Sequence, residues 1–195
     1  MLSVTSGISD VTDSSSYGGQ KRRESGRAAQ MKGFFQNMKV TLYTDGAARG
    51  NPDGPGGYGA VLQYVDQKGV LHEKELSAGY VKTTNNRMEL MAAIAGLEAL
   101  TRPCEVELYS DSRYLVDAFN QKWIESWVKN KWKRPKSGQV KNVDLWERLL
   151  RAMEPHQVSF YWVRGHDGHP ENERCDRLAT GAADGTGLLT DPGVS

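Results

Sequence analysis

The sequence predicts an α/β domain built on a five-stranded mixed sheet, in which three antiparallel strands are followed by two parallel strands and helices flank the sheet. Two observations carry this prediction. Three strand-like segments, the first of which alternates apolar and polar residues, follow one another with short turns between them, which is typical of antiparallel hairpins. Two later alternating segments are preceded by helical patterns, which favours parallel pairing through crossover connections.

The expected elements follow one another from residue 39 to residue 183. Residues 39–45 (KVTLYTD) alternate and end at Asp45, and a glycine-rich turn leads to strands at 60–65 and 71–80. Residues 84–87 open a helix whose apolar side chains recur at helical spacing, namely Leu90, Ala93, Ile94 and Leu97. We then expect a strand at 105–110, helices at 112–119, 123–133 and 143–153, a strand at 157–163 and a helix at 172–183.

Length, charge and cysteine content exclude several classes of protein. The chain has 195 residues, a formal net charge of +1 and two cysteines. This length fits one domain of roughly 150 residues plus an extra segment. No apolar run approaches the roughly 18 residues of a membrane span, and two cysteines cannot form a disulfide framework. We therefore expect a cytoplasmic, monomeric protein with no membrane partner.

The composition divides the chain into three parts. Residues 1–37 are rich in Ser, Gly and Asp and are expected to form a disordered N-terminal extension. This extension is either a dispensable tail or the result of an early start codon, with Met31 or Met38 as the alternative start. Residues 38–184 are expected to form the ordered domain, and residues 185–195 a flexible C-terminal tail.

Two aspartates occupy equivalent places in two predicted strands. Asp45 and Asp111 each come at the end of a strand with the same alternation, so both carboxylates emerge on one side of the sheet if the strands are neighbours. Open α/β sheets bind ligands outside the carboxyl ends of their strands. Taken singly, each aspartate could instead be a turn or N-cap residue.

Two further carboxylates lie near the start of predicted helices. Glu89 shares a helix face with Ala93 and Gly96, small residues that would let the helix approach the sheet and aim Glu89 at the strand ends. A capping box between Asn86 and Glu89 is the local alternative. Asp176, in the last helix, presents the same choice between chemistry and capping.

A cluster of these four carboxylates would need divalent cations, because converging negative charges repel one another. Oxygen ligands favour Mg²⁺ or Mn²⁺, and two such ions can activate water and stabilise the leaving oxygen of a phosphodiester. His166 follows the last strand in a glycine-rich loop, which suits a mobile proton shuttle. A zinc ligand or a solvated loop histidine are the alternatives, although the CxxC and HxxxH spacings of zinc sites are absent.

Residues 121–141 form a basic, tryptophan-rich arm that favours a polyanionic partner. Three tryptophans are interleaved with seven basic residues, and Glu125 is the one acidic residue of the segment. The alternative is a solvated helix whose tryptophans pack inward. The basic residues are Lys122, Lys129, Lys131, Lys133, Arg134, Lys136 and Lys141.

Several long motifs, in the same order, closely resemble bacterial ribonuclease HI over about residues 38–184. They are TDGAARGNPDGPGGYGAVL, TTNNRMELMAAIAGL, YSDSRYLVDAF, KNVDLW and WVRGHDGHPENERCDRLA. The resemblance implies the RNase H fold and endonucleolytic cleavage of the RNA strand of RNA–DNA hybrids, with 5′-phosphate and 3′-hydroxyl products. It also implies two Mg²⁺ ions in the active complex, which Mn²⁺ can replace.

The resemblance also implies roles for individual residues. The catalytic, metal-binding carboxylates would be Asp45, Glu89, Asp111 and Asp176, with His166 as a mobile catalytic histidine. The substrate-binding residues would be Asn51, Thr84, Asn85, Asn86, Lys122, Lys129, Lys131, Lys133 and Lys136. Arg113 stands where many relatives carry Gln, and Asp167 is an added acid beside the histidine. Another nuclease of the same superfamily and a non-catalytic hybrid-binding module remain the competing interpretations.

Overall fold

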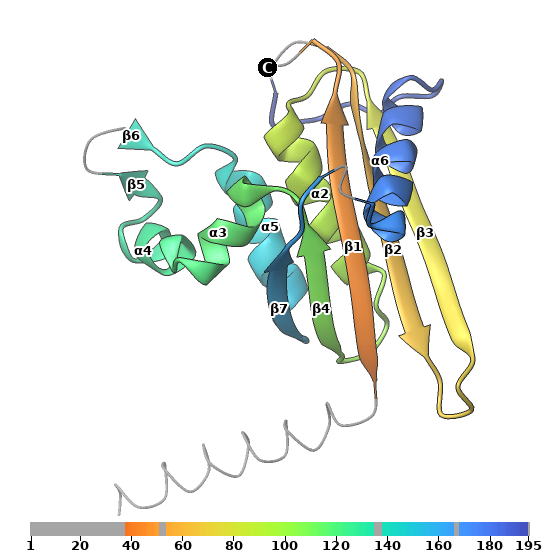
Figure 1. The fold of residues 1–195 in the computed structure, drawn as a ribbon. Helices are drawn as coiled ribbons and strands as arrows, with labels where there is room; N and C mark the ends of the chain where they lie inside the picture. Colours follow the sequence, from red (N-terminus) through yellow and green to blue (C-terminus); the bar gives the residue numbers. More distant parts are fainter. Residues whose placement is uncertain (1–37, 51–53, 135–137, 166–167, 195) are drawn as a thin grey trace, which may run out of the picture. The chain divides into compact units, whose positions relative to one another are not determined.

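A five-stranded mixed sheet forms the centre of the domain (Figure 1). The structure is a computed structural model that describes residues 38–50, 54–134, 138–165 and 168–194. The strands lie in the order β3-β2-β1-β4-β7, with bounds β1 Lys39–Ala48, β2 Gly56–Val65, β3 Leu71–Tyr80, β4 Glu105–Ser110 and β7 Gln157–Trp162. The β1–β2 and β2–β3 pairs are antiparallel, whereas the β1–β4 and β4–β7 pairs are parallel. The predicted fold class is confirmed.

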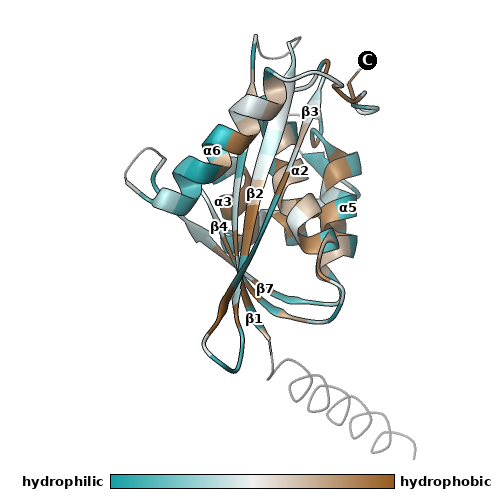
Figure 2. Ribbon diagram, turned by 90° about the vertical axis from the view of Figure 1, so that its right-hand side faces the viewer, coloured by the Kyte–Doolittle hydropathy of each residue, from teal (hydrophilic) through white to brown (hydrophobic). Residues whose placement is uncertain are grey.

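Helices cover both faces of the sheet. Helix α6 lies on one face, and α2 and α5 lie on the other (Figure 2). The helix bounds are α2 Asn85–Glu98, α3 Arg113–Asn120, α4 Trp123–Lys129, α5 Val143–Met153 and α6 Pro170–Ala183. None of these described helices is long and apolar enough to cross a membrane.

The main hydrophobic core fills the space between the sheet and α2. Leu42 of β1 and Leu108 of β4 are fully buried and are register partners, so they face the helix together. Gly96 lets α2 approach this row, because a Cβ at Gly96 would lie 2.6 Å from Leu42 Cδ1. Trp146 of α5 is also fully buried in the same core. The apolar alternation of the strands therefore fixes which face α2 covers.

Helix α6 packs directly on the backbone of β2 and β3. A Cβ at Gly57, Gly59 or Gly79 would collide with the α6 backbone, so these positions accept only glycine without rearrangement. The sequence assigns residues 56–59 to a turn, but β2 begins at Gly56. The prediction was wrong there because these glycines allow close helix packing in a strand and do not mark a turn.

The helix in the basic arm is shorter than the sequence predicts. The helix expected at 123–133 ends at Lys129, because Lys131 and Trp132 adopt left-handed backbone conformations with φ of 54° and 60°. A two-stranded ribbon follows, formed by β5 Lys133–Arg134 and β6 Gly138–Gln139. Lys136 lies outside the described residues.

The segment predicted to be a flexible tail has defined contacts in its described part. Leu189 forms a parallel β-bridge with Tyr80. Its N–H donates to the Gly79 carbonyl at 2.8 Å, and its carbonyl accepts from the Val81 N–H at 2.9 Å. Asp191 follows and is only 5% exposed. The end of the chain thus extends the edge of the sheet and then enters the protein.

Candidate functional site

Asp45 and Asp111 meet at one edge of the sheet because their strands are parallel neighbours. The register pairs Tyr43 with Tyr109, which places the two aspartates in the next row on the same face. Asp45 lies within β1, which continues beyond its predicted end, and its Oδ1 accepts the Gly46 N–H at 2.8 Å. Asp45 is 8% exposed, so its carboxylate is largely removed from water.

Glu89 reaches Asp45 because α2 crosses β1 at a glycine. A Cβ at Gly46 would collide with the backbone of Met88 and Glu89, so glycine is required for this approach. The capping-box alternative is wrong: Thr84 is the N-cap, and its Oγ1 accepts the Arg87 N–H at 3.4 Å. Glu89 is therefore not part of a capping box, and its carboxylate lies beside those at the strand ends.

Three carboxylates converge at this edge of the sheet. One oxygen each from Asp45, Glu89 and Asp111 lies within 4.8 Å of the others. The loop after β7 approaches from the other side, because a Cβ at Gly165 would lie 2.5 Å from Asp111 Oδ2. Glu89 Oε1 accepts from Asn85 Nδ2 at 3.3 Å, whereas the buried Oε2 has no hydrogen-bond partner within the described part of the chain.

The cluster is electrostatically unfavourable without a cation. Burial, then the charges of Asp111 and Asp176, raise the pKa of Asp45 to about 7 despite the Gly46 hydrogen bond. Burial, then the charges of Asp45 and Asp111, raise the pKa of Glu89 well above its ordinary value. A buried oxygen without a partner is costly, so this oxygen-only donor set fits a hard divalent cation.

Asp176 lies beside the three-carboxylate group and not within it. Its charge raises the pKa of Asp45, but its oxygens are not among those within 4.8 Å of one another. Its backbone carbonyl accepts from Thr180 Oγ1 at 2.8 Å in α6. Because α6 packs on the glycines of β2 and β3, it holds Asp176 on the opposite face from α2.

The turn before Glu89 carries three of the predicted substrate contacts. Thr84 and Asn85 are half-buried and Asn86 is exposed, at the start of α2. They therefore lie on the surface within a few residues of a buried carboxylate. Asn51 and His166 lie outside the described residues, so their roles stay predictions.

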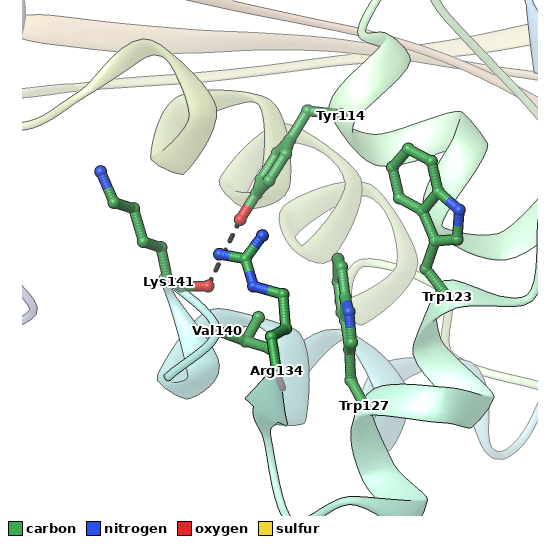
Figure 3. A pocket seen from close by; sticks show the side chains of 6 residues that line it. All are labelled: Tyr114, Trp123, Trp127, Arg134, Val140 and Lys141. Carbon is green, nitrogen blue, oxygen red and sulfur yellow. Dashed lines mark hydrogen bonds between the residues drawn. The ribbon is translucent and has the colours of Figure 1, made fainter. Parts of the chain in front are cut away.

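The basic arm presents exposed cations around an aromatic cavity. Lys122, Lys129, Lys131 and Lys133 are exposed. Beside them is a cavity of about 360 Å³, lined by Tyr114, Trp123, Trp127, Arg134, Val140 and Lys141 (Figure 3). The Arg134 Nε is buried without a hydrogen-bond partner among the residues that the structure describes. Sequence reasoning missed Tyr114 and Val140, which come from outside the helical repeat of tryptophans.

Arg113 stacks on an aromatic ring next to the edge of the sheet that carries the carboxylate cluster. Its guanidinium carbon lies 3.7 Å from the centre of the Trp162 ring, and Trp162 Nε1 donates to the backbone carbonyl of Asp111 at 3.0 Å. Cation–π stacking of this kind favours a fixed orientation. Arg113 is therefore connected through Trp162 to the backbone that carries Asp111.

Comparisons with known proteins agree with this geometry. The sequence model of the RNase H family matches residues 37–184. A ribonuclease H from Lachnoclostridium phytofermentans is 69% identical over 154 residues, covering 79% of this chain and 98% of that protein. A ribonuclease HI from a Synechocystis species is 54% identical over 154 residues, covering 79% and 93%. The crystal structure of LC9-RNase H1, described as a type 1 RNase H with the type 2 active-site motif, covers 82% of this chain and 80% of its own at 33% identity, with a TM-score of 0.71.

Proposed function

This chain belongs to the RNase H family, a family of endonucleases that hydrolyse RNA in RNA–DNA hybrids, and we propose that it cuts the RNA strand with two Mg²⁺ ions held by four carboxylates. The products would be 5′-phosphate and 3′-hydroxyl ends, and Mn²⁺ would substitute for Mg²⁺. The observation that carries the proposal is the group of Asp45, Glu89 and Asp111 with its unpartnered Glu89 oxygen.

The donor atoms of the cluster favour magnesium over softer metals. All three side chains offer carboxylate oxygens, which suit Mg²⁺ and Mn²⁺ better than zinc. Bound divalent cations supply an activated water and stabilise charge on the leaving oxygen. Asp176, outside the tight group, would complete the ligand set from α6 when a cation and a phosphate are present.

Proton transfer and substrate positioning would be carried out by residues outside the carboxylate cluster. His166 would move a proton to or from the reacting oxygens and assist departure of the product, as its glycine-rich loop permits. Asn51 and the Thr84–Asn86 turn would contact the hybrid backbone close to the cluster. RNA is distinguished from DNA by its 2′-hydroxyls, whereas the other strand is held through its phosphates.

The basic arm would bind the hybrid at a distance from the reacting bond. Neutralising Lys129, Lys131, Lys133 and Lys136 together should raise KM far more than it lowers kcat, because these charges bind substrate and transition state equally. The dependence of affinity on salt should also weaken. Replacing Lys68 and Lys74 in the β2–β3 hairpin is the control. If KM and the dependence of affinity on salt are both unchanged, the arm is a solvated surface helix that does not bind the hybrid.

A cleavage assay on matched substrates tests the proposed function. A labelled RNA–DNA hybrid should be cut in Mg²⁺ and left intact in EDTA, while duplex DNA and duplex RNA of the same sequence should remain uncut. Cleavage of duplex DNA would indicate another nuclease of the same superfamily. Binding of the hybrid without cleavage in either Mg²⁺ or Mn²⁺ would indicate a non-catalytic hybrid-binding module. We also propose that the chain acts as a cytoplasmic monomer.

A further inference from the structure

The end of the chain reaches the start of helix α2, although the two are far apart in sequence. We refer to residues 188–193 as the C-terminal strap. Leu189 pairs with the end of β3 through hydrogen bonds to Gly79 and Val81. Two residues later the strap turns inward and buries Asp191, which is 5% exposed. The strap therefore anchors on the sheet edge before its carboxylate enters the protein.

Asp191 is fully satisfied by hydrogen bonds from both sides. Its Oδ2 accepts from Thr83 Oγ1 at 2.7 Å and from Arg87 Nε at 2.7 Å. Its Oδ1 accepts from Arg87 Nη2 at 2.7 Å and from the Gly193 N–H at 3.1 Å. A Cβ at Gly193 would collide with the Arg87 guanidinium, so the strap passes directly against this group. The bidentate geometry fixes both distance and orientation.

The partners of Asp191 stand on either side of the turn that carries the proposed substrate contacts. Thr83 immediately precedes Thr84, and Arg87 immediately follows Asn86. The Thr83 N–H also donates to the Gly54 carbonyl at 3.1 Å, which ties the turn to the loop before β2. One carboxylate thus holds both ends of a three-residue segment, and Glu89 lies two residues beyond the second end.

Arg87 also donates hydrogen bonds to residues at the start of α5. Its Nη1 and Nη2 donate to the two oxygens of Asp144 at 3.0 and 2.7 Å, and Nη1 also donates to Asn142 Oδ1 at 3.4 Å. Together with Asp191, these partners use all five N–H groups that a guanidinium offers. The Arg87 side chain is only 3% exposed. Because it is buried and fully hydrogen-bonded, it restricts movement of the backbone at the start of α2.

We propose that Asp191 is a positioning residue for substrate binding, through which the C-terminal strap holds the Thr84–Asn86 turn in the geometry that grips the hybrid. This inference rests on the proposed function. Pre-organised contacts bind more tightly because less conformational freedom is lost on association. The hydrogen bonds described for the strap lead to the end of β3 and to Thr83 and Arg87. Its loss should therefore weaken binding of the hybrid without removing the chemistry.

The test compares Asp191→Asn with Glu98→Gln at a temperature where circular dichroism shows both variants folded. Glu98 is a matched control, because it too makes a bidentate pair with an arginine. Its partner is Arg148 of α5, and the pair lies at the other end of α2. Asp191→Asn should raise the KM for the hybrid roughly 10-fold, as expected for misplacement of a binding segment, and change kcat by less than about twofold. Hybrid affinity measured in EDTA should fall by the same factor, and Glu98→Gln should change neither value.

A second variant keeps the inference testable if Asp191→Asn does not fold. Thr83→Val removes one hydroxyl while leaving the ion pair, and it should raise KM by about threefold with kcat unchanged. A wild-type chain that does not cleave hybrids overturns the proposed function, whatever the variants do. A wild-type chain that cleaves, with folded variants whose KM and EDTA affinity are unchanged, overturns the inference alone. A lower kcat at unchanged KM also overturns it, because it would place the effect at the metal site.

Discussion

Two buried charged sites begin in the same turn of α2, and they are built in opposite ways. Arg87 and Asp191 have a hydrogen bond for every donor and acceptor position that they offer. Glu89, two residues further along, has a buried oxygen with no partner in the described ranges and lies against a second buried carboxylate, that of Asp45. The protein alone satisfies the first site, whereas we propose that a bound cation completes the second.

The carboxylate pKa values of the two sites are shifted in opposite directions. Burial raises the pKa of Asp191, but hydrogen bonds from Arg87, Thr83 and Gly193 outweigh it and lower the pKa below its ordinary value. Burial and neighbouring carboxylates raise the pKa of Asp45 to about 7. Perturbation of this second kind is typical of functional sites. The contrast teaches that burial alone does not separate function from stability, whereas the presence or absence of compensating partners does.

The largest expected effect comes from removing a ligand of the unsatisfied site. Asp45→Asn should abolish hybrid cleavage in Mg²⁺, because an amide is a poor ligand for a hard cation that a carboxylate neutralises. The thermal midpoint of the metal-free protein should stay the same or rise, because one repelling charge is gone. Cleavage and calorimetric melting in EDTA measure the two effects. Asp66→Asn, in the β2–β3 turn, is the control, and near-native turnover of Asp45→Asn would contradict the assignment.

Removing a carboxylate from the satisfied site should lower the stability of the protein, whereas Asp45→Asn should leave it unchanged or raise it. Asp191→Asn should lower the free energy of unfolding by about 3–5 kcal/mol, because Arg87 is left buried with an incomplete partner set. Asp144→Asn should cost about 1 kcal/mol, since Asp144 is half-exposed and water can replace part of its interaction. Urea titration of both variants measures the difference. Equal losses would show that burial of the carboxylate does not decide its contribution.

The pH dependence of stability should separate the two sites again. Because the folded metal-free chain holds the Asp45 proton more tightly than the unfolded chain, the free energy of unfolding should fall as pH rises from about 4 to about 7. The lowered pKa of Asp191 acts in reverse: its stabilisation is present above its ordinary pKa and is lost as pH falls through the lower folded value. Urea unfolding in EDTA from pH 3 to 8 should give difference curves of opposite slope for Asp45→Asn and Asp191→Asn.

The smallest effect should come from an ion pair with similar geometry but open to water. Glu98 and Arg148 are both 43% exposed and are joined at 2.7 Å. Glu98→Gln should lower the free energy of unfolding by less than about 1 kcal/mol, as is usual for surface pairs. Urea titration beside Asp191→Asn measures this directly. A loss as large as that of Asp191→Asn would mean that bidentate geometry, and not burial, sets the energetic difference.

The sequence predicts the parts of the molecule that depend on local periodicity. Alternation in two strands places Asp45 and Asp111 in one row, and helical spacing with small residues directs Glu89 toward them. The early end of α4 was not predictable in this way, because left-handed Lys131 and Trp132 carry no glycine signal. The Asp191–Arg87 pair joins residues 104 positions apart, and no local pattern reports such a contact. Polar composition near a terminus therefore indicated a loose tail where the fold uses a buried carboxylate.

A cation titration tests the central claim most directly, namely that the carboxylate cluster of Asp45, Glu89 and Asp111 is incomplete without a divalent ion. Isothermal titration of Mn²⁺ into the full chain, Asp45→Asn and Asp191→Asn should be made at pH 6 and pH 8. We expect binding by the full chain and by Asp191→Asn that strengthens from pH 6 to pH 8, because ligands must lose protons before they bind metal. Asp45→Asn should bind far more weakly at both values. Equal Mn²⁺ affinity in Asp45→Asn and the full chain would contradict the account.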